Sequence, residues 1–360
     1  MEPFPLPTKT LYAELMDQLA LLEAQELLGS GSGSLVTKIV KGETYLYFQH
    51  SHPGGSRPLQ VYLGKKNPEL EQLSRNLQKK REDGTRHREH VRLLCAQIRS
   101  GGGLVTDTAS ARVIQAFAEA GFFRLGGVLV GTHAFTVFGN LLGRRWDHAA
   151  LKTHVDLAAE KTLKIGVPAL QTSIPQVLEG LEMGFLPIPS LNPKHPSTSF
   201  TVRGSSLRVD LLTPLVGPPK TKPVYIPRFQ AAAQPLRFMD YLIENPVKGA
   251  LIDAGGILVH VPQPARFALH KLIVSGERSS VWQTKSDKDL HQAVQILSFL
   301  TEEFPEEIHA AWKALSSRGA GWSKRLLSSL QKMGKINQGL SADLKRDFFT
   351  PKTPSLRSLQ

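Results

Sequence analysis

The stretch Gly126–Ala159, GGVLVGTHAFTVFGNLLGRRWDHAALKTHVDLAA, holds two candidate functional elements about one helix apart. Its apolar run Val128–Val130 ends at Gly131 and Thr132, and apolar residues then recur at helical spacing as far as Leu142. This pattern predicts a strand, a tight turn and a helix. Backbone N–H groups at such a helix N-terminus favour a phosphate, but an ordinary turn with Thr132 as helix N-cap also explains the pattern.

Carboxylates recur in two later segments that are typical of strands. His154 and Asp156 alternate, so we expect them on the same side of one strand. Asp210 lies in the apolar segment 206–214, where an unpaired carboxylate would be costly. Carboxylates that converge from two neighbouring strands can hold Mg²⁺, which shares its oxygen ligands with substrate phosphates. This arrangement is the one that metal-assisted phosphoryl transfer uses.

Four motifs together resemble a bacterial nucleotidyltransferase-like family of the DNA polymerase beta-like superfamily. They are Gly131–Phe135, Gly139–Trp146, the triplet His154–Asp156 and Val209–Pro214. The resemblance extends over most of the chain, from residue 34 to residue 300. It implies a small mixed sheet, a Gly-Ser/Thr loop for the triphosphate of an NTP, and three acidic residues that bind two divalent metal ions.

The resemblance also implies roles for individual residues. Asp156 and Asp210 would be the catalytic and metal-binding carboxylates, and Asp210 would act as general base toward an acceptor hydroxyl. The alternative for Arg145 is an exposed loop charge, and the alternative for Lys271 is a surface side chain that only covers apolar neighbours. The residues expected to contact the nucleotide are Gly131, Thr132, Asn140, Arg145 and Lys271.

His154 departs from the family pattern at the first metal ligand. The family has Asp-x-Asp where this chain has His154-Val155-Asp156. A neutral imidazole suits Mn²⁺ or Zn²⁺ better than Mg²⁺, and it removes one negative charge from the site. Three explanations remain open: a changed metal preference, a natural loss of catalysis, or a substitution introduced to inactivate the protein.

Composition points to a globular protein with a polyanionic partner. Lys and Arg exceed Asp and Glu by 13 over 360 residues, which favours RNA or nucleotide phosphates as partners. Cys95 is the single cysteine, so no intrachain disulfide forms and a reducing compartment is expected. No run of 18 apolar residues occurs, and the first residues do not resemble a signal peptide, so we expect a cytoplasmic protein without a membrane segment.

We expect an α+β fold with a nucleotidyltransferase-like mixed sheet as its core, a small N-terminal antiparallel β module and a C-terminal helical bundle. In the core, Leu170–Met183 is expected as a helix, and Phe238–Leu242 and Ile257–Val261 as its last strands. His133 is expected at the surface or as a helix-capping residue. The expected divisions are 1–30 for an N-terminal helix and linker, 31–103 for the β module and a charged helical arm, 104–261 for the core, 262–344 for the helical domain, and 345–360 for a basic, disordered tail.

The N-terminal segments leave alternatives open. The leucine-rich helix before Gly29 packs either on its own core or on a second subunit. Tyr45, Tyr47 and Tyr62 lie among basic residues, which is typical of a nucleic-acid-binding sheet but also of a small sheet whose tyrosines cover a core. The charged arm 68–98 is either a solvated helix or a grip for a phosphate backbone.

The leading prediction is therefore a protein that transfers a nucleoside monophosphate from an NTP to an acceptor with Mg²⁺ or Mn²⁺. The acceptor could be RNA, tRNA in particular, a protein side chain or a small molecule, and the positive charge favours RNA. One alternative is a non-catalytic nucleic-acid-binding or regulatory protein on a degenerate transferase core. Another is a toxin or defence component of the same fold.

Overall fold

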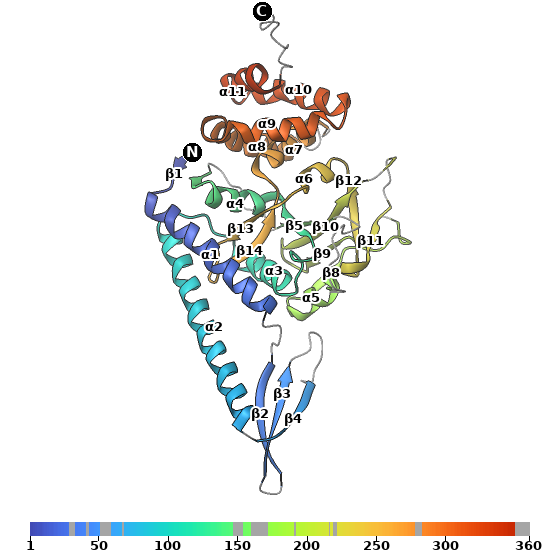
Figure 1. Cartoon of the computed structure of the whole chain (residues 1–360). Helices are drawn as coiled ribbons and strands as arrows, with labels where there is room; N and C mark the ends of the chain where they lie inside the picture. Colours follow the sequence, from blue (N-terminus) through green and yellow to red (C-terminus); the bar gives the residue numbers. More distant parts are fainter. Residues whose placement is uncertain are drawn as a thin grey trace, which may run out of the picture.

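The structure is a computed structural model of the full chain, and it describes the positions of most of the residues. The described residues are 1–28, 33–40, 43–50, 59–66, 68–146, 154–159, 172–190, 192–215, 217–218, 222–277 and 283–349. The expected linker at 29–32 and the tail from 350 onward lie outside them. Figure 1 shows three parts along one direction: a small sheet, a central α/β core, and a stack of C-terminal helices on the opposite side.

A mixed seven-stranded sheet forms the centre of the core. Strands β7 and β10 run parallel, β5 pairs antiparallel with β7, and β12 runs parallel to β10 on the other edge. That edge of β10 is shared, because β9 pairs with its first half and β12 with its last. The strands are β5 (Gly127–Val130), β7 (His154–Ala159), β8 (Phe185–Pro187), β9 (Ser199–Val202), β10 (Arg208–Pro214), β11 (Val224–Ile226) and β12 (Ala231–Leu236).

Helices and a second sheet cover this centre. The Asp107 side chain caps α3 by accepting a hydrogen bond from the Ser110 N–H, and Gly121 at φ 81° follows the end of the helix. Helix α4 packs on β13, and α3 packs on β14. The elements are α3 (Thr108–Glu119), α4 (Gly131–Leu141), α5 (Ile174–Gly180), η1 (Pro227–Phe229), α6 (Met239–Leu242), β13 (Val247–Leu251) and β14 (Ile257–Val261).

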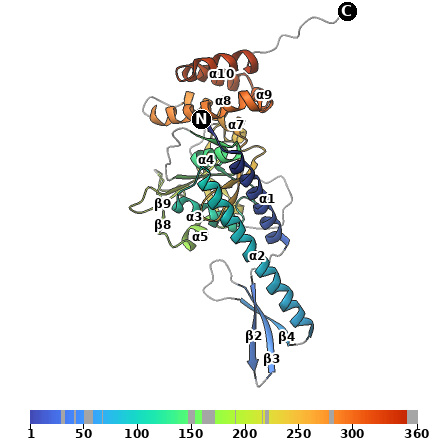
Figure 2. The same cartoon turned by 90° about the vertical axis from the view of Figure 1, so that its left-hand side faces the viewer.

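The N-terminal segments form an extension of the core. Helix α1 packs on its own chain, since the Tyr12 hydroxyl donates to the Ala250 carbonyl and accepts from the Ala250 N–H, and Leu15 is fully buried. The long helix α2 runs from the small sheet to the core (Figures 1 and 2). These elements are α1 (Leu6–Leu28), β2 (Gly33–Val40), β3 (Glu43–His50), β4 (Leu59–Lys65) and α2 (Pro68–Ser100), and a short pair joins β1 (Glu2–Pro3) to β6 (Arg144–Arg145).

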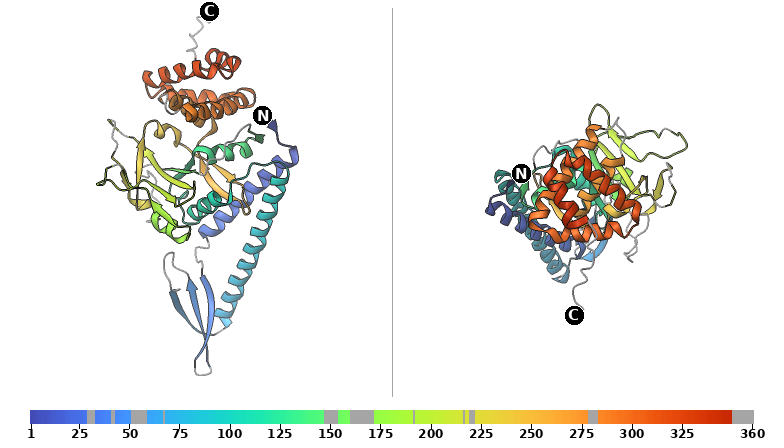
Figure 3. Two further views of the ribbon diagram at one scale, coloured as in Figure 1. Left: turned by 180° about the vertical axis from the view of Figure 1, so that it is seen from behind. Right: turned by 90° about the horizontal axis from the view of Figure 1, so that it is seen from above.

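The C-terminal helices stack over the core, as the view from above in Figure 3 shows. They are α7 (Pro264–Glu277), α8 (Gln283–Glu303), α9 (Pro305–Ser316), α10 (Ala320–Gly334), α11 (Gln338–Leu344) and a last helical segment, η3 (Lys345–Phe349). Phe267 of α7 packs edge to face on Phe138 of α4, with ring centroids 5.0 Å apart, so the helical part and the core share buried apolar contacts. None of the helices in the described part of the chain combines the length and apolarity that a bilayer-spanning segment needs.

The expected α+β class, mixed sheet and C-terminal helical region are confirmed, and several local expectations are wrong. Phe238–Leu242 is not a strand: Phe238 takes φ 66°, which ends the extended backbone, and Met239–Leu242 form the short helix α6. The helix expected at Leu170–Met183 is limited to α5, with residues 170–171 outside the described part.

The expected disorder from Lys345 is also wrong as far as residue 349. Lys345–Phe349 are helical, because Phe348 and Phe349 bury their rings against His309 and Trp312. His133 is buried inside α4, with 1% of its surface exposed, and does not lie at the surface.

Candidate functional site

The phosphate-loop candidate is a direct junction of β5 and α4. Gly131 begins α4 with φ 70°, a conformation that favours glycine. The helix N-cap is Val130, which offers no side-chain cap, so the interpretation of Thr132 as N-cap is wrong. The first N–H groups of a helix lack partners within the helix and, with its dipole, favour an anion. The junction therefore has the backbone geometry of an anion site.

A lysine from a distant helix lies against this junction. Lys288 of α8 donates from Nζ to the Thr132 hydroxyl at 2.7 Å, and Thr132 itself is 8% exposed. The two residues are 156 positions apart, so the folding of α8 onto the core brings them together. Lys288 was not among the residues expected at the site from the sequence. Its position beside Gly131 adds a positive charge where a phosphate would bind.

The carboxylate positions and the end of β5 form one row across four strands. Asp156 of β7 pairs in register with Val130 on one side and with Asp210 of β10 on the other, and Asp210 pairs with Ser199 of β9. We call Val130, Asp156, Asp210 and Ser199 the strand row. Neighbouring strands lie about 4.8 Å apart, so the backbones of Val130 and Asp210 are roughly 10 Å apart. The expectation that the two carboxylates come from neighbouring strands is confirmed.

Asp210 already holds a cationic partner. Its Oδ1 accepts from Arg208 Nε at 2.8 Å and from the Ser199 hydroxyl, and Arg208 Nη2 donates to Ser199 Oγ at 3.1 Å. The Asp210 side chain is 20% exposed and that of Arg208 is 42% exposed. Neither Ser199 nor Arg208 was expected at the site from the sequence. The alternation of β10, which places Arg208 on the same side as Asp210, was the available signal for Arg208.

His154 and Asp156 are placed by their backbone. His154 pairs in register with Arg208, two positions before the pairing of Asp156 with Asp210. The side chains of His154 and Asp156 are outside the described part of the chain. Register partners and residues two apart share a face of a sheet, so the backbone brings the three expected metal-binding positions to one region.

Asn140 and Arg145 lie away from this region. Asn140 is nine residues along α4 from Gly131, about 13 Å at 1.5 Å per residue. Both polar atoms of its amide bond the Leu104 backbone: Oδ1 accepts from the N–H at 2.7 Å and Nδ2 donates to the carbonyl at 2.8 Å. Arg145 donates to the Gly102 carbonyl at 3.2 Å. These contacts hold the 102–104 segment, and the structure does not bring either side chain to Gly131.

Lys271 belongs to a largely buried ion pair with Asp289, the residue next to Lys288. Its Nζ donates to Asp289 Oδ1 at 2.6 Å, and the two side chains are 15% and 5% exposed. Nζ also lies 5.0 Å from the centre of the Phe267 ring. Asp289 is the residue after Lys288, so the pair fixes the start of α8 next to the junction. Of the two lysines, Lys288 is the one that contacts the expected phosphate loop.

The donor chemistry fits a divalent metal. Among the described side chains, no group of three or more His, Cys, Asp or Glu residues is arranged to hold a metal ion, and that set does not include His154 and Asp156. Two carboxylates on neighbouring strands would supply oxygen donors suited to Mg²⁺ or Mn²⁺, and one imidazole would add a nitrogen donor that suits Mn²⁺ better than Mg²⁺. Arg208 shows that Asp210 accepts a cationic group at this position.

Comparison with known proteins supports the same assignment of the core. A family model described as Nucleotidyltransferase matches residues 108–317, which begins at α3 and ends just after α9. The match includes the strand row, Gly131, Lys271 and Lys288, and leaves out α1, α2 and the small sheet. No curated protein and no solved structure matches the chain. Because the matched residues make up more than half of the chain, it belongs to this nucleotidyltransferase family.

Proposed function

We propose that the chain transfers a nucleoside monophosphate from an NTP to an acceptor, in the manner of the DNA polymerase beta-like superfamily. The strand row is the observation that carries this proposal. It brings the end of β5, and with it the Gly131 junction, beside the carboxylate positions 156 and 210. A triphosphate and the metal that binds it need such neighbouring positions.

The triphosphate is proposed to bind the Gly131 junction. Backbone N–H groups at the start of α4, the Thr132 hydroxyl and the Lys288 ammonium would contact its oxygens. Lys271 is assigned a supporting role through Asp289, since its ammonium is engaged in that buried pair. Asn140 and Arg145 are left out of the proposed nucleotide contacts because they hold the 102–104 segment.

Asp156 and Asp210, with His154 as a third donor, are proposed to hold Mg²⁺ or Mn²⁺. When bound, the metal supplies positive charge that stabilises the phosphate oxygens. Asp210 is the proposed general base, which takes the proton of the acceptor hydroxyl. The acceptor oxygen forms a bond to the α-phosphorus, the bond from that phosphorus to the bridging oxygen breaks, and pyrophosphate leaves with the electron pair. Arg208 must release Asp210 for this role.

RNA, including tRNA, is the proposed acceptor. The net charge of +13 supports a polyanionic partner, since Lys and Arg contacts with phosphates supply most of the affinity for nucleic acids. The single cysteine, Cys95, supports a reducing compartment such as a bacterial cytoplasm.

One observation favours a second candidate, a binding protein on a degenerate transferase core. His154 lowers the negative charge at the expected metal position, and Arg208 neutralises Asp210. Both features weaken the attraction for a divalent cation. Such a protein would bind nucleic acid but would not transfer nucleotides.

The test is transfer of label from each α-labelled NTP to bacterial RNA and, separately, to protein, with Mg²⁺ or Mn²⁺. The native chain is compared with Asp156→Ala, His154→Asp and the matched control Asp17→Ala, an exposed carboxylate on α1. Transfer by the native chain and the control, but not by Asp156→Ala, supports the proposal. Transfer only by His154→Asp identifies a disabled core, and no transfer by any variant with any nucleotide supports the binding protein. Label on protein alone contradicts RNA as acceptor.

A further inference from the structure

The small sheet and α2 form an extension that the family match does not cover. Figures 1 and 2 show the sheet at the end of α2 that is remote from the core. Residues 33–100 contain thirteen Lys and Arg and six Asp and Glu, a net charge of +7 out of +13 for the whole chain. About a fifth of the residues therefore carries more than half of the excess positive charge.

Strand register orders basic and aromatic residues on one face of this sheet. Lys38 of β2, Tyr45 of β3 and Lys65 of β4 are partners in one row across the three strands. Tyr47 lies two residues from Tyr45, so both tyrosines share this face. Beyond the row of Leu46, the register shifts by one residue on β4, and Tyr47 has Tyr62 as its backbone partner.

Burial shows that this face is accessible. The Lys38 side chain is exposed, the Lys65 side chain is 60% exposed, and Tyr45 and Tyr47 are each half-buried. Leu46, which lies between the tyrosines and so on the opposite face, is 3% exposed. The buried apolar contact at this position is therefore made on the other face. Tyr45 and Tyr47 do not need to fill a core there.

The contacts of these lysines leave their charge close to the rings. Lys38 Nζ lies 4.8 Å from the centre of the Tyr47 ring, a cation–π contact. Lys65 forms a 2.7 Å ion pair with Glu43, and this side chain is 50% exposed. An exposed pair of this kind contributes little, so a phosphate can replace the carboxylate at small cost. Glu43 is the one acidic residue in the segment 33–66.

We infer that this face of the small sheet binds single-stranded nucleic acid, with bases stacked on Tyr45 and Tyr47 and phosphates held by Lys38 and Lys65. Rings between cations on one face of a sheet are what a stacked, negatively charged strand requires. The inference rests on the proposed function in one respect: the bound strand belongs to the acceptor. Because the sheet lies at the end of α2 that is remote from the core, an acceptor that reaches both the sheet and the strand row must be a macromolecule.

The test is direct binding, measured by fluorescence anisotropy with labelled U20 RNA and dT20 DNA and with neither NTP nor metal present. The full chain is compared with Tyr45→Ala/Tyr47→Ala, the conservative Tyr45→Phe/Tyr47→Phe, and Lys38→Glu/Lys65→Glu. The matched charge control is Lys324→Glu/Lys332→Glu, two exposed lysines on α10. The unfolding temperature of each variant is measured to establish that it folds.

We expect the alanine pair to weaken binding roughly tenfold or more, because stacking is lost, and the phenylalanine pair to retain it. The Lys38→Glu/Lys65→Glu pair should lower the slope of log affinity against log salt by about 1.4, or about 0.7 per lysine. The α10 control should bind as the native chain does. Tighter binding of U20 than of dT20 would assign the site to RNA, and the reverse order would assign it to DNA.

The outcome is separable from that of the transfer assay. Asp156→Ala and Asp210→Ala should bind U20 as the native chain does, whether or not the native chain transfers nucleotides. If transfer fails but the sheet variants lose binding, the proposed function falls and the site stands. Native-like binding by the folded alanine and glutamate pairs overturns the site. If the sheet variants still bind both oligonucleotides but no longer label protein, the face serves a protein acceptor, and the proposed nucleic-acid site is also overturned.

Discussion

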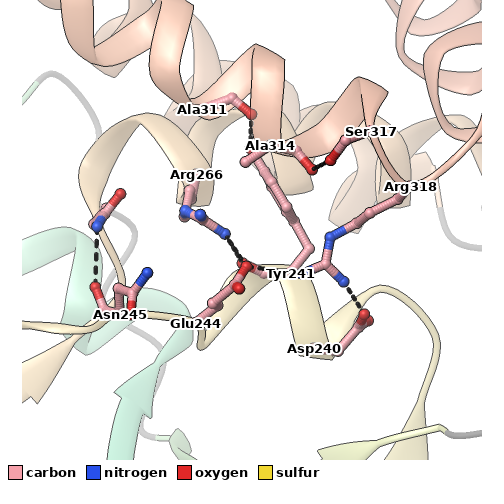
Figure 4. Close-up of polar contacts among 10 residues, drawn as sticks. Asp240, Tyr241, Glu244, Asn245, Arg266, Ala311, Ala314, Ser317 and Arg318 are labelled. Atoms are coloured by element: carbon pink, nitrogen blue, oxygen red, sulfur yellow. Dashed lines mark hydrogen bonds and ion pairs between the residues drawn. The ribbon is translucent and has the colours of Figure 1, made fainter.

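The strand row and the interface between the core and the C-terminal helices each have an arginine bonded to a carboxylate, with different consequences. At this helical interface, shown in Figure 4, Arg266 Nη1 donates to Glu244 at 2.7 Å and to the Tyr241 carbonyl at 3.1 Å. Arg318 donates to Glu244 at 2.8 Å and also to Asp240. At the strand row, Asp210 is bonded by Arg208, which lies two residues before it on the same strand.

Sequence separation and the burial of the arginine side chains distinguish the two regions. The Arg266 side chain is 9% exposed. The contacts at the helical interface connect residues 22 to 78 positions apart, so they fix how α6 packs on the C-terminal helices. Arg208 is 42% exposed and connects nothing distant to Asp210. An ion pair that joins remote elements serves the fold, whereas a local, half-exposed pair can open at little cost to stability. Charge alone does not tell the two kinds apart.

The largest expected effect separates Asp210 from Asp240. Asp210→Ala should lower nucleotide transfer roughly 100- to 10,000-fold, as expected for loss of a general base, while the free energy of unfolding changes by less than about 1 kcal/mol. Asp240→Ala, the same change at the helical interface, should leave transfer unchanged. Steady-state kinetics and urea unfolding measure both. A transfer-competent Asp210→Ala would remove this residue from the proposed chemistry.

Lys271 provides a second contrast, because its partner is deeply buried. Lys271→Met should destabilise the chain by about 3 kcal/mol in urea unfolding, since Asp289 is 3% exposed and would lose this cation. The double variant Lys271→Met/Asp289→Leu should recover much of the loss, because it removes both charges. A stable Lys271→Met with a raised KM for NTP would instead show that Lys271 faces the nucleotide.

Replacement of Lys288 should affect the KM for NTP more than stability, whereas replacement of Lys271 should affect stability. Lys288→Met should raise the KM for NTP about tenfold, the loss of one charge-assisted contact, with only a small change in stability. Lys288→Arg keeps the charge and should bind NTP more tightly than Lys288→Met. An unchanged KM in both variants would exclude Lys288 from the triphosphate site.

The smallest expected effect is a pH dependence of stability that comes from Glu244 at the helical interface. Partial burial raises the pKa of Glu244, but Arg266 and Arg318 outweigh it, and the net pKa lies below its ordinary value. The stabilisation is therefore present above the unfolded pKa of about 4.3 and is lost as pH falls through the lower folded pKa. Because the side chain is 44% exposed, we expect less than about 1 kcal/mol.

Urea unfolding between pH 6 and the acid limit of folding tests this dependence. The native chain should lose slightly more stability on acidification than Glu244→Gln does. Equal acid sensitivity of the two chains would show that the pairing at Glu244 does not contribute.

Local patterns predicted the elements that carry the site. The apolar run before Gly131 and the helical spacing after it specify β5 and α4, and the apolar segment 206–214 specifies the strand β10 that carries Asp210. The two strands that carry Asp156 and Asp210 follow from local patterns, whereas their pairing as neighbours is a long-range contact. Their metal-binding and catalytic roles stay predictions.

Long-range contacts were beyond the sequence. Lys288 reaches Thr132 across 156 positions, and nothing in the local pattern of α8 distinguishes Lys288 from its charged neighbours. Strand β12 was missed because alanines and Pro235 have low strand propensity, and its parallel pairing with β10 outweighs that preference. Phe238–Leu242 is rich in aromatic and apolar residues, as strands are, but the consecutive burial of Tyr241 and Leu242 fits the short helix α6 better than a strand with alternating faces.

Helix α2 connects the small sheet to the core as one uninterrupted helix, and in a helix length and rotation are coupled. Each added residue lengthens it by about 1.5 Å and turns everything beyond it by about 100°. A single insertion would therefore aim the tyrosine face away from its original direction, whereas seven inserted residues would nearly restore the direction at a greater distance. The angular phase of α2, more than its length, would determine which acceptors can contact both ends of the molecule at once.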